Sequence, residues 1–204
     1  MIHARRYKPK VKTNKRKAII SAAIEIFARK GYNDAGISDI AQRANVANGT
    51  VYLYFKNKDD LLLQSMQEVM SVSLVEIKKK VAPIKNAVEK LFQFFVEHVE
   101  LFTQNPNMAR FLVVELRQCE EFYKKHPSYN PYNEYLHYVQ EICTQSIKEK
   151  TTRNYDPQTL SFVIVGAMDM VLTQWVINPD GVNLPRLNAE IRDILHFGMG
   201  EPEA

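Results

Sequence analysis

Apolar residues recur every three or four positions along most of this chain, and that spacing restricts it to helices. The first run, KAIISAAIEIFARKGY, forms one apolar stripe that stops at a glycine, so we expect a helix over roughly 15–30. The stripe consists of Ile19, Ala22, Ala23, Ile26 and Phe27. Long stretches rich in Ala, Leu, Glu, Lys and Gln, which lose little rotamer freedom in helices, indicate an all-α fold.

Two short helices are expected next. In ISDIAQRANV the spacing of Ile37, Ile40 and Ala41 predicts about two turns that stop near Asn45, a residue type that tolerates the left-handed conformation. After a tight connection, GTVYLYF directs Val51 and Phe55 inward from a second short helix. Two short helices joined by a turn of three or four residues make a helix-turn-helix, whose second helix can enter the major groove of DNA.

A long fourth helix and five further helices complete the predicted fold. Asn57 and Asp60 form a capping-box arrangement at the start of the fourth helix, which should run to about Lys80. Prolines divide the remaining sequence, and the segments between them predict helices near 84–104, 107–125, 131–150, 157–178 and 185–197. The sequence therefore predicts about nine helices in all.

The charge of the chain is polarised along its length. Residues 1–58 carry 13 Lys and Arg against 3 Asp and Glu, whereas residues 59–204 carry 14 against 20. A basic N-terminal third is the electrostatic footprint of a protein that binds a polyanion such as DNA. The alternative is that the first residues form only a solvated basic tail.

Composition and motifs argue against several other classes of protein. Cys119 and Cys143 lack the spacing of a zinc site or a disulfide framework, which fits a reducing cytoplasm, and the histidines show no metal-ligand spacing. The basic start is followed by no apolar signal region. Phosphate-loop, dinucleotide-binding and nucleophile-elbow motifs are missing from the sequence, so we expect neither an enzyme nor a cofactor or metal.

The run GYNDAGISDIAQRANVANGTVYLYFKNKDDLL resembles the DNA-binding region of TetR-family bacterial repressors, over residues 16–63. YLYFKNK and the later ELRQ are most similar to FadR-type regulators of fatty acid degradation, which respond to long-chain acyl-CoA. The resemblance implies an N-terminal helix-turn-helix domain followed by a larger helical domain. Its expected division is a basic flexible arm at 1–14, a DNA-binding domain at 15–60, and a ligand-binding and dimerisation domain at 61–204.

The resemblance and the residue types together define a predicted DNA-binding set. It consists of Ser38, Asn48, Gly49, Thr50, Tyr52, Tyr54 and Lys58. Asn48 and Thr50 are expected to read bases, and Gly49 lets the helix backbone approach DNA closely. The other four position the phosphate backbone, and the Arg5–Lys17 arm adds nonspecific or minor-groove attraction. Alternatively, the tyrosines are packing residues and the lysines a solvated rim. The sequence departs from the family at Gly36, Asn45 and Ala47, and the last change leaves Asn48 a candidate helix cap instead of a base reader.

LSFVIVGAMDMVLTQWVI, residues 160–177, is apolar almost all round and just long enough to span a membrane. Because it contains Asp169 and Gln174 and lies between amphipathic helices, we expect it instead to be buried in its own domain and against a partner subunit. The predicted dimer interface is Leu160, Ile164, Val171, Trp175, Leu187, Ile191, Ile194 and Leu195. A two-fold dimer would bind an inverted-repeat operator with half-sites about 34–36 Å apart.

A predicted effector site comprises Phe92, Phe95, Phe111, Glu115, Gln118, Tyr135, Tyr138 and Met168. In MARFLVVELRQCEEF, Glu115 and Gln118 interrupt an apolar face, and they could orient a ligand, bond to neighbouring helices or be exposed. Arg117 is expected to pair with Glu121 on the surface, or to meet a phosphate in an acyl-CoA sensor. The aromatic residues could equally be plain core.

Three functions remain open from the sequence. The first is a cytoplasmic repressor that binds operator DNA as a dimer and is released by an apolar effector, with a long-chain acyl-CoA as the candidate. The second is an efflux-pump repressor that senses hydrophobic or cationic drugs. The third is a DNA-binding scaffold without effector control.

Overall fold

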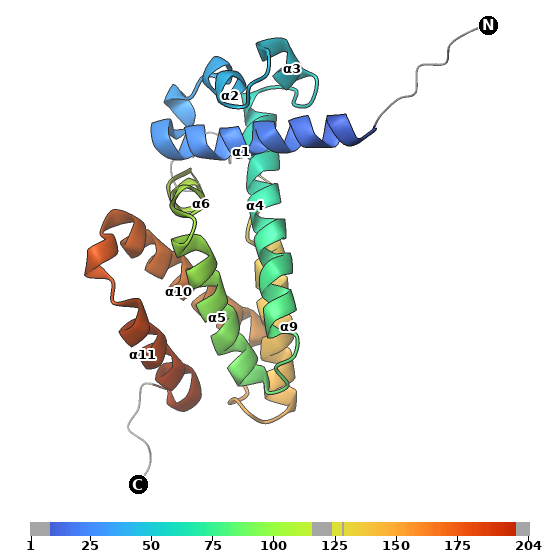
Figure 1. Cartoon of the computed structure of the whole chain (residues 1–204). Helices are drawn as coiled ribbons and strands as arrows, with labels where there is room; N and C mark the ends of the chain where they lie inside the picture. Colours follow the sequence, from blue (N-terminus) through green and yellow to red (C-terminus); the bar gives the residue numbers. More distant parts are fainter. Residues whose placement is uncertain (1–8, 116–123, 128, 199–204) are drawn as a thin grey trace, which may run out of the picture. The chain divides into compact units, whose positions relative to one another are not determined.

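The computed structural model describes residues 9–115, 124–127 and 129–198, which hold nine α-helices and no strand. The all-α prediction is confirmed (Figure 1). The helices are α1 (Pro9–Asp34), α2 (Ile37–Arg43), α3 (Asn48–Tyr52), α4 (Lys58–Val81), α5 (Ala87–Thr103), α6 (Pro106–Arg110), α9 (Asn133–Lys148), α10 (Pro157–Ile177) and α11 (Leu184–Phe197). A π-helix, η1 (Phe111–Glu115), follows α6, and a 3-10 turn, η2 (Pro179–Gly181), follows α10.

Helix α1 is longer at both ends than its sequence pattern suggests. It starts at Pro9, so part of the predicted flexible arm is helical, and residues 1–8 lie outside the described part of the chain. Near its end Gly31 leaves the helical conformation, with φ of 78° and ψ of 162°, and one more turn follows. Glycine adopts this positive φ without the steric cost of a Cβ, so the apolar stripe ends at a kink and not at the end of the helix.

The chain divides into two compact units, and the first contains residues 1–68 and 110–127. Its core is built on the predicted stripe of α1, of which Ile19 and Phe27 are fully buried, together with Ile40 of α2. Phe111 of η1 stacks on Phe27 with ring centroids 6.1 Å apart and planes 18° apart. Helices α1 and α2 therefore share this core.

Helix α4 begins as predicted, with Asn57 as its cap. The Asp60 amide donates to Asn57 Oδ1 at 2.8 Å, while Asp60 Oδ2 accepts from the amide of Lys56 at 2.8 Å. The helix runs without interruption to Val81, and the division between the two units falls within it, after Glu68. The predicted domain boundary at residue 60 also lies in this helix.

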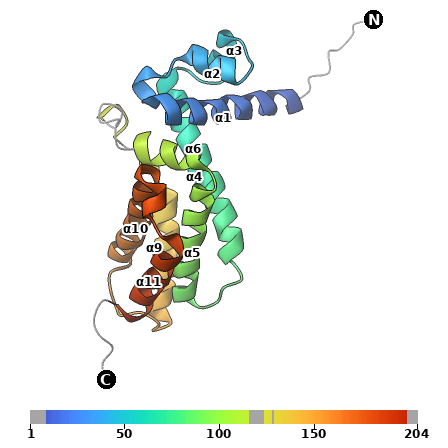
Figure 2. The same cartoon turned by 60° about the vertical axis from the view of Figure 1, so that its left-hand side comes forward.

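The second unit, residues 69–109 and 128–204, is a helical bundle. Helices α5, α9 and α10 pack against one another, and α11 lies along α5 (Figure 2). Arg192 of α11 donates to Glu89 of α5 at 2.9 Å, and His196 lies 3.1 Å from the same carboxylate. The bounds of α5, α9, α10 and α11 agree with the predicted helices to within a few residues.

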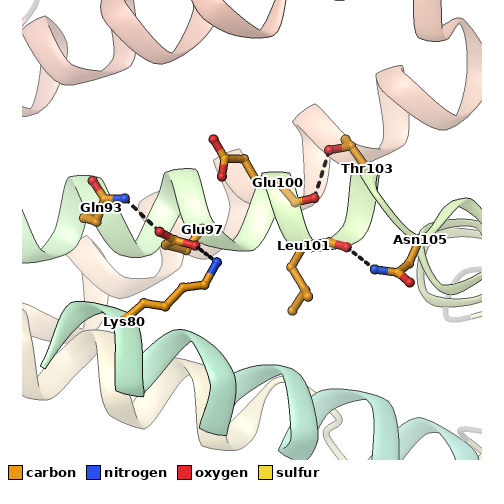
Figure 3. Close-up of polar contacts among 7 residues, drawn as sticks. All are labelled: Lys80, Gln93, Glu97, Glu100, Leu101, Thr103 and Asn105. Carbon is orange, nitrogen blue, oxygen red and sulfur yellow. Dashed lines mark hydrogen bonds and ion pairs between the residues drawn. The ribbon is translucent and has the colours of Figure 1, made fainter.

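Polar contacts hold the end of α4 against α5 and cap the C-terminal end of α5. Lys80 of α4 pairs with the Glu97 carboxylate, which also accepts from Gln93 at 3.0 Å (Figure 3). At the C-terminal end of α5, Asn105 Nδ2 donates to the carbonyl oxygen of Leu101 at 2.7 Å. This side chain satisfies one of the carbonyls that a helix end leaves without a partner, and Pro106 then starts the next element.

The structure also alters the predicted helix over 107–125. It begins as α6 and continues as the π-helix η1, in which hydrogen bonds run from i to i+5. The helix therefore changes its hydrogen-bonding type at Phe111. Residues 116–123 lie outside the described part of the chain.

Candidate DNA-binding surface and effector core

Charged contacts fix α2 on α1. The Asp39 carboxylate accepts from Lys30 at 2.7 Å and from the Gly36 amide at 3.1 Å, and these two contacts lower the pKa of Asp39. At the other end of α2, Arg43 pairs with Glu25 at 2.7 Å. Asp39 therefore takes over the N-terminal capping that the glycine at position 36 cannot supply with a side chain.

The turn between α2 and α3 has the predicted left-handed residue. Asn45 has φ of 54°, and the following Val46 amide donates to the carbonyl oxygen of Ala41 at 2.9 Å. Val51 and Phe55 are each 1% exposed and anchor the α3 segment in the core of the first unit. This turn and these two anchors set the orientation of α3 relative to α2.

The predicted DNA-binding residues lie on the outer side of the helix-turn-helix. Tyr52 is 56% exposed, Ser38, Asn48 and Gly49 are exposed, and Thr50 and Tyr54 are half-buried. Leu53, which the prediction omitted, is 78% exposed. No side-chain hydrogen bond caps α3, so Asn48 is not engaged as the cap.

Gly49 has no packing role within the chain. A Cβ built at this position would meet no other atom within 4 Å. Because glycine is less favourable than alanine in a helix, packing does not explain its presence.

The Lys58 ammonium makes two contacts within the first unit, although it stands at a helix N-terminus. Its Nζ donates to the carbonyl oxygen of Asn33 at 3.1 Å and lies 4.5 Å from the centroid of the Tyr32 ring. The Tyr32 hydroxyl in turn bonds to the Asp59 carboxylate. The sequence pattern did not predict this cluster, because it joins residues 32 and 33 to residues 58 and 59 and no periodicity links the two segments.

Arg16 of the predicted basic arm is also engaged within the first unit. It donates to Gln64 at 2.8 Å, pairs with Glu68 at 3.3 Å, and lies 5.8 Å from the centroid of the Phe55 ring. Its guanidinium therefore ties α1 to α4. Lys15 and Lys17 beside it are exposed.

The exposed apolar face of α10 differs from the one predicted. Ile164 and Val171, both assigned to the dimer interface, are buried in the core of their own unit, and Trp175 and Leu160 are half-buried. The predicted set was selected from an almost wholly apolar stretch, whose pattern does not separate inner from outer faces. The exposed apolar residues are Phe162, Val163, Gly166, Met170 and Ile177, and the exposed Gln174 lies among them.

On α11, Ile194 is exposed, whereas Leu187, Ile191 and Leu195 are half-buried. An open pocket of about 440 Å³ lies between α10 and α11 and includes Val171 and Leu187 of the predicted interface. None of the predicted effector residues lines it.

Among the described residues, α10 is the one helix with the length and composition to cross a membrane. In its most apolar stretch of 18 residues, 39% of the residues are buried in the protein.

The structure does not bring the predicted effector residues together as one set. Phe111 packs against Phe27 in the first unit. The side chains of Glu115, Arg117 and Gln118 lie outside the described part of the chain. Phe92 is half-buried with the Arg192 guanidinium 5.4 Å from its ring centroid.

The remaining predicted effector residues belong to the second unit. Phe95, Tyr135 and Met168 are buried there, and Tyr138 is half-buried. Phe94, which the prediction omitted, lies 5.7 Å from Tyr135 and 5.4 Å from Tyr138 between ring centroids.

Two buried polar residues beside Tyr135 were also missed. His98 is 3% exposed and Ser73 is 1% exposed. Burial lowers the pKa of His98 to about 3, so its imidazole is neutral, and burial raises the pKa of the Tyr135 hydroxyl. In a single sequence, a lone histidine or serine on an apolar helix face cannot be recognised as part of a buried polar cluster.

Comparison with protein families assigns both parts of the chain. Residues 19–64 match the family described as "Bacterial regulatory proteins, tetR family". Residues 66–198 match "YsiA-like protein, C-terminal region". The first match spans the helix-turn-helix and the start of α4, and the second spans the rest of the helical bundle.

Individual relatives cover almost the whole chain. The chain is 32% identical over 196 residues to the "Fatty acid metabolism regulator protein" of Bacillus subtilis, covering 93% of this chain and 98% of the relative. The structure of the fatty acid degradation regulator FadR from Bacillus halodurans superposes with a TM-score of 0.82 at 29% identity, covering 90% of this chain and 99% of that one. The structure of FadR from Bacillus subtilis in complex with stearoyl-CoA superposes with a TM-score of 0.81 at 31% identity, and it also covers 90% of this chain and 99% of that one.

Proposed function

Because the chain belongs to the TetR family of bacterial regulatory proteins, and is therefore a DNA-binding transcription regulator and not an enzyme, we propose that it represses fatty acid metabolism genes and is released from operator DNA by a long-chain acyl-CoA. The observation that carries this proposal is the match to the Bacillus subtilis fatty acid regulator at 32% identity over almost its full length. The stearoyl-CoA complex of that species' FadR supports the choice of effector.

The DNA-binding half of the proposal uses the outer side of α2 and α3. Asn48 and Thr50 read base edges, and Ser38, Tyr52, Tyr54 and Lys58 hold the phosphate backbone. Exposure of Asn48 and Tyr52, and the unexplained glycine at position 49, support this division. The protein acts in the cytoplasm, where its DNA lies.

The proposal includes a homodimer formed through α10 and α11. The exposed stripe Phe162, Val163, Gly166, Met170 and Ile177 is apolar, and such a stripe on a helix favours burial against a second copy. Two copies related by two-fold symmetry would read an inverted repeat with half-sites about 34–36 Å apart.

Control by an effector requires that the effector favour one arrangement of the dimer. Helix α4 belongs to both units of the subunit, so a change of its tilt moves the DNA-binding helices. An acyl-CoA releases DNA only if it binds the released arrangement more tightly than the bound one.

The test begins with selection of the bound sequence from random duplexes, followed by competition with small molecules. We expect an inverted repeat, and release by stearoyl-CoA but not by coenzyme A or by free stearate. Release by a cationic aromatic drug instead would identify an efflux repressor. Binding that no small molecule changes would identify a scaffold.

A further inference from the structure

Three buried polar side chains meet in the core of the second unit, which we name the polar node: Ser73 of α4, His98 of α5 and Tyr135 of α9. They are 1%, 3% and 0% exposed. The His98 and Tyr135 rings meet edge to face with centroids 5.3 Å apart, and the Ser73 hydroxyl acts on that of Tyr135 closely enough to oppose the rise in its pKa. Three different helices therefore direct polar groups to one place.

No hydrogen bond of ordinary length and angle reaches the three polar atoms of the polar node from the described residues, although the Ser73 hydroxyl lies close enough to that of Tyr135 to oppose the rise in its pKa. Ser73 Oγ, His98 Nδ1 and Tyr135 OH are all buried and unsatisfied. A buried polar atom without a partner costs about 1–3 kcal/mol, and native cores contain few of them. The His98 Nδ1 atom and the remaining hydrogen-bonding capacity of the two hydroxyls match a polar group that a ligand brings.

A row of aromatic rings connects the polar node to the surface. Phe94 lies 5.7 Å from Tyr135 and 5.4 Å from Tyr138, which is half-buried. The Lys78 ammonium lies 4.2 Å from the centroid of the Tyr138 ring. The row therefore starts at a surface cation and ends at buried hydrogen-bonding groups.

Next to His98 the core is apolar. Phe102 is fully buried, with its ring centroid 4.7 Å from that of His98. The sequence of environments is thus cation, aromatic ring, polar node and apolar core. An acyl-CoA has the same sequence of groups: charged phosphates, a slender pantetheine arm, a thioester carbonyl and a hydrocarbon chain.

We propose that the polar node binds the thioester carbonyl oxygen of the acyl effector, with the acyl chain passing toward Phe102 and the coenzyme leaving past Tyr138 and Lys78. This inference rests on the proposed function, because it takes an acyl-CoA as the effector. The Tyr135 and Ser73 hydroxyls donate to the carbonyl oxygen. The neutral His98 ring packs edge to face on the Tyr135 ring and so holds Tyr135 in position.

The polar node also gives the effector a hold on α4. Ser73 lies on that helix, beyond the point at which α4 leaves the DNA-binding unit. The groups of the polar node are closed to solvent, so the carbonyl enters only when α4, α5 and α9 separate slightly. A ligand that stabilises the separated arrangement shifts the population toward it.

The experiment compares two ligands on two matched variants. The ligands are stearoyl-CoA and S-octadecyl-CoA, a thioether in which a methylene replaces the carbonyl. The variants are Tyr135→Phe, which removes only the buried hydroxyl, and Tyr155→Phe, which removes an exposed one. Dissociation constants are measured by titration calorimetry on the full chain.

We expect Tyr135→Phe to weaken stearoyl-CoA binding about 5- to 10-fold and to change thioether binding by less than about twofold, as for the loss of one hydrogen bond. Tyr155→Phe should change neither. Equal changes for both ligands, or a shift in melting temperature without any change in affinity, would overturn the proposal. If the unaltered protein binds neither ligand, the proposed function fails instead.

Discussion

The ammonium of Lys58 donates a hydrogen bond to the carbonyl oxygen of Asn33, 3.1 Å away, across the start of α4 and the end of α1. The same ammonium lies over the Tyr32 ring. A cation at a helix N-terminus is unfavourable by itself, and these two contacts offset that cost within the protein. Lys58 therefore holds α4 to α1 and also presents a positive charge next to the DNA-binding surface.

Lys58→Ala should weaken binding to operator and to random duplex by the same factor. The variant loses a backbone contact and not a base contact, so the slope of log affinity against log salt should fall by about one. Fluorescence anisotropy over a series of salt concentrations measures both quantities. Lys148→Ala, which removes an exposed lysine from the second unit, is the control and should leave the slope unchanged.

Asn48→Ala should instead change which sequences are bound. Its exposed amide can pair with adenine, and loss of one such contact costs about 1–3 kcal/mol of discrimination at a single position. Selection from random duplexes, repeated for the variant, should show relaxed preference at one base pair in each half-site. An unchanged preference with uniformly lower affinity would assign Asn48 to the backbone.

Gly49→Ala should make the protein more stable and bind DNA less tightly. Alanine is favoured over glycine in a helix by about 0.5–1 kcal/mol, and the added Cβ meets nothing within the chain. On DNA the same methyl group obstructs the close approach of α3. Chemical denaturation and operator affinity test the two effects separately, and unchanged affinity would remove Gly49 from the interface.

The helices of this chain follow from local patterns, which is why they could be predicted. Asn57 caps α4, Asn45 adopts the left-handed turn, and Val51 and Phe55 anchor the α3 segment, each as its residue type and spacing require. The π-helix η1 was not foreseen, because FLVVE carries no breaker that distinguishes it from α-helix.

The sites were harder to predict because they depend on contacts between distant segments. Periodicity gave Tyr135 as a core or ligand residue but could not place His98 and Ser73 beside it. Likewise, Ile164 was assigned to the subunit interface, yet its side chain is covered by its own unit. In an almost wholly apolar helix the outer face is fixed by packing alone.

Met170→Lys should prevent formation of the proposed dimer. The side chain is 50% exposed on the apolar stripe of α10, and burying a lysine charge there in a subunit interface costs desolvation free energy. Sedimentation velocity at micromolar concentration measures the change, and operator affinity should fall with it. Val75→Lys alters an equally exposed apolar residue on α4, and this variant should form the proposed dimer as the unaltered protein does.

His98 makes the stability of the second unit depend on pH. Burial lowers its pKa to about 3, whereas an unfolded histidine titrates near 6.5. Below about pH 6.5 the unfolded chain therefore binds a proton that the folded chain does not, so stability is complete above that pH and falls as the pH drops toward 3. The loss between pH 7.5 and 5.0 should be about 2 kcal/mol.

His98→Gln removes the titrating group and keeps a polar side chain of similar size. Urea unfolding across this pH range should give a shallower decline for the variant than for the unaltered protein, with a difference of about 2 kcal/mol between the two ends of the range. His137→Gln, at an exposed histidine, should follow the unaltered protein. Parallel curves for the unaltered protein and His98→Gln would mean that His98 takes up its proton in the folded state, and therefore that its imidazole is not closed off in the core.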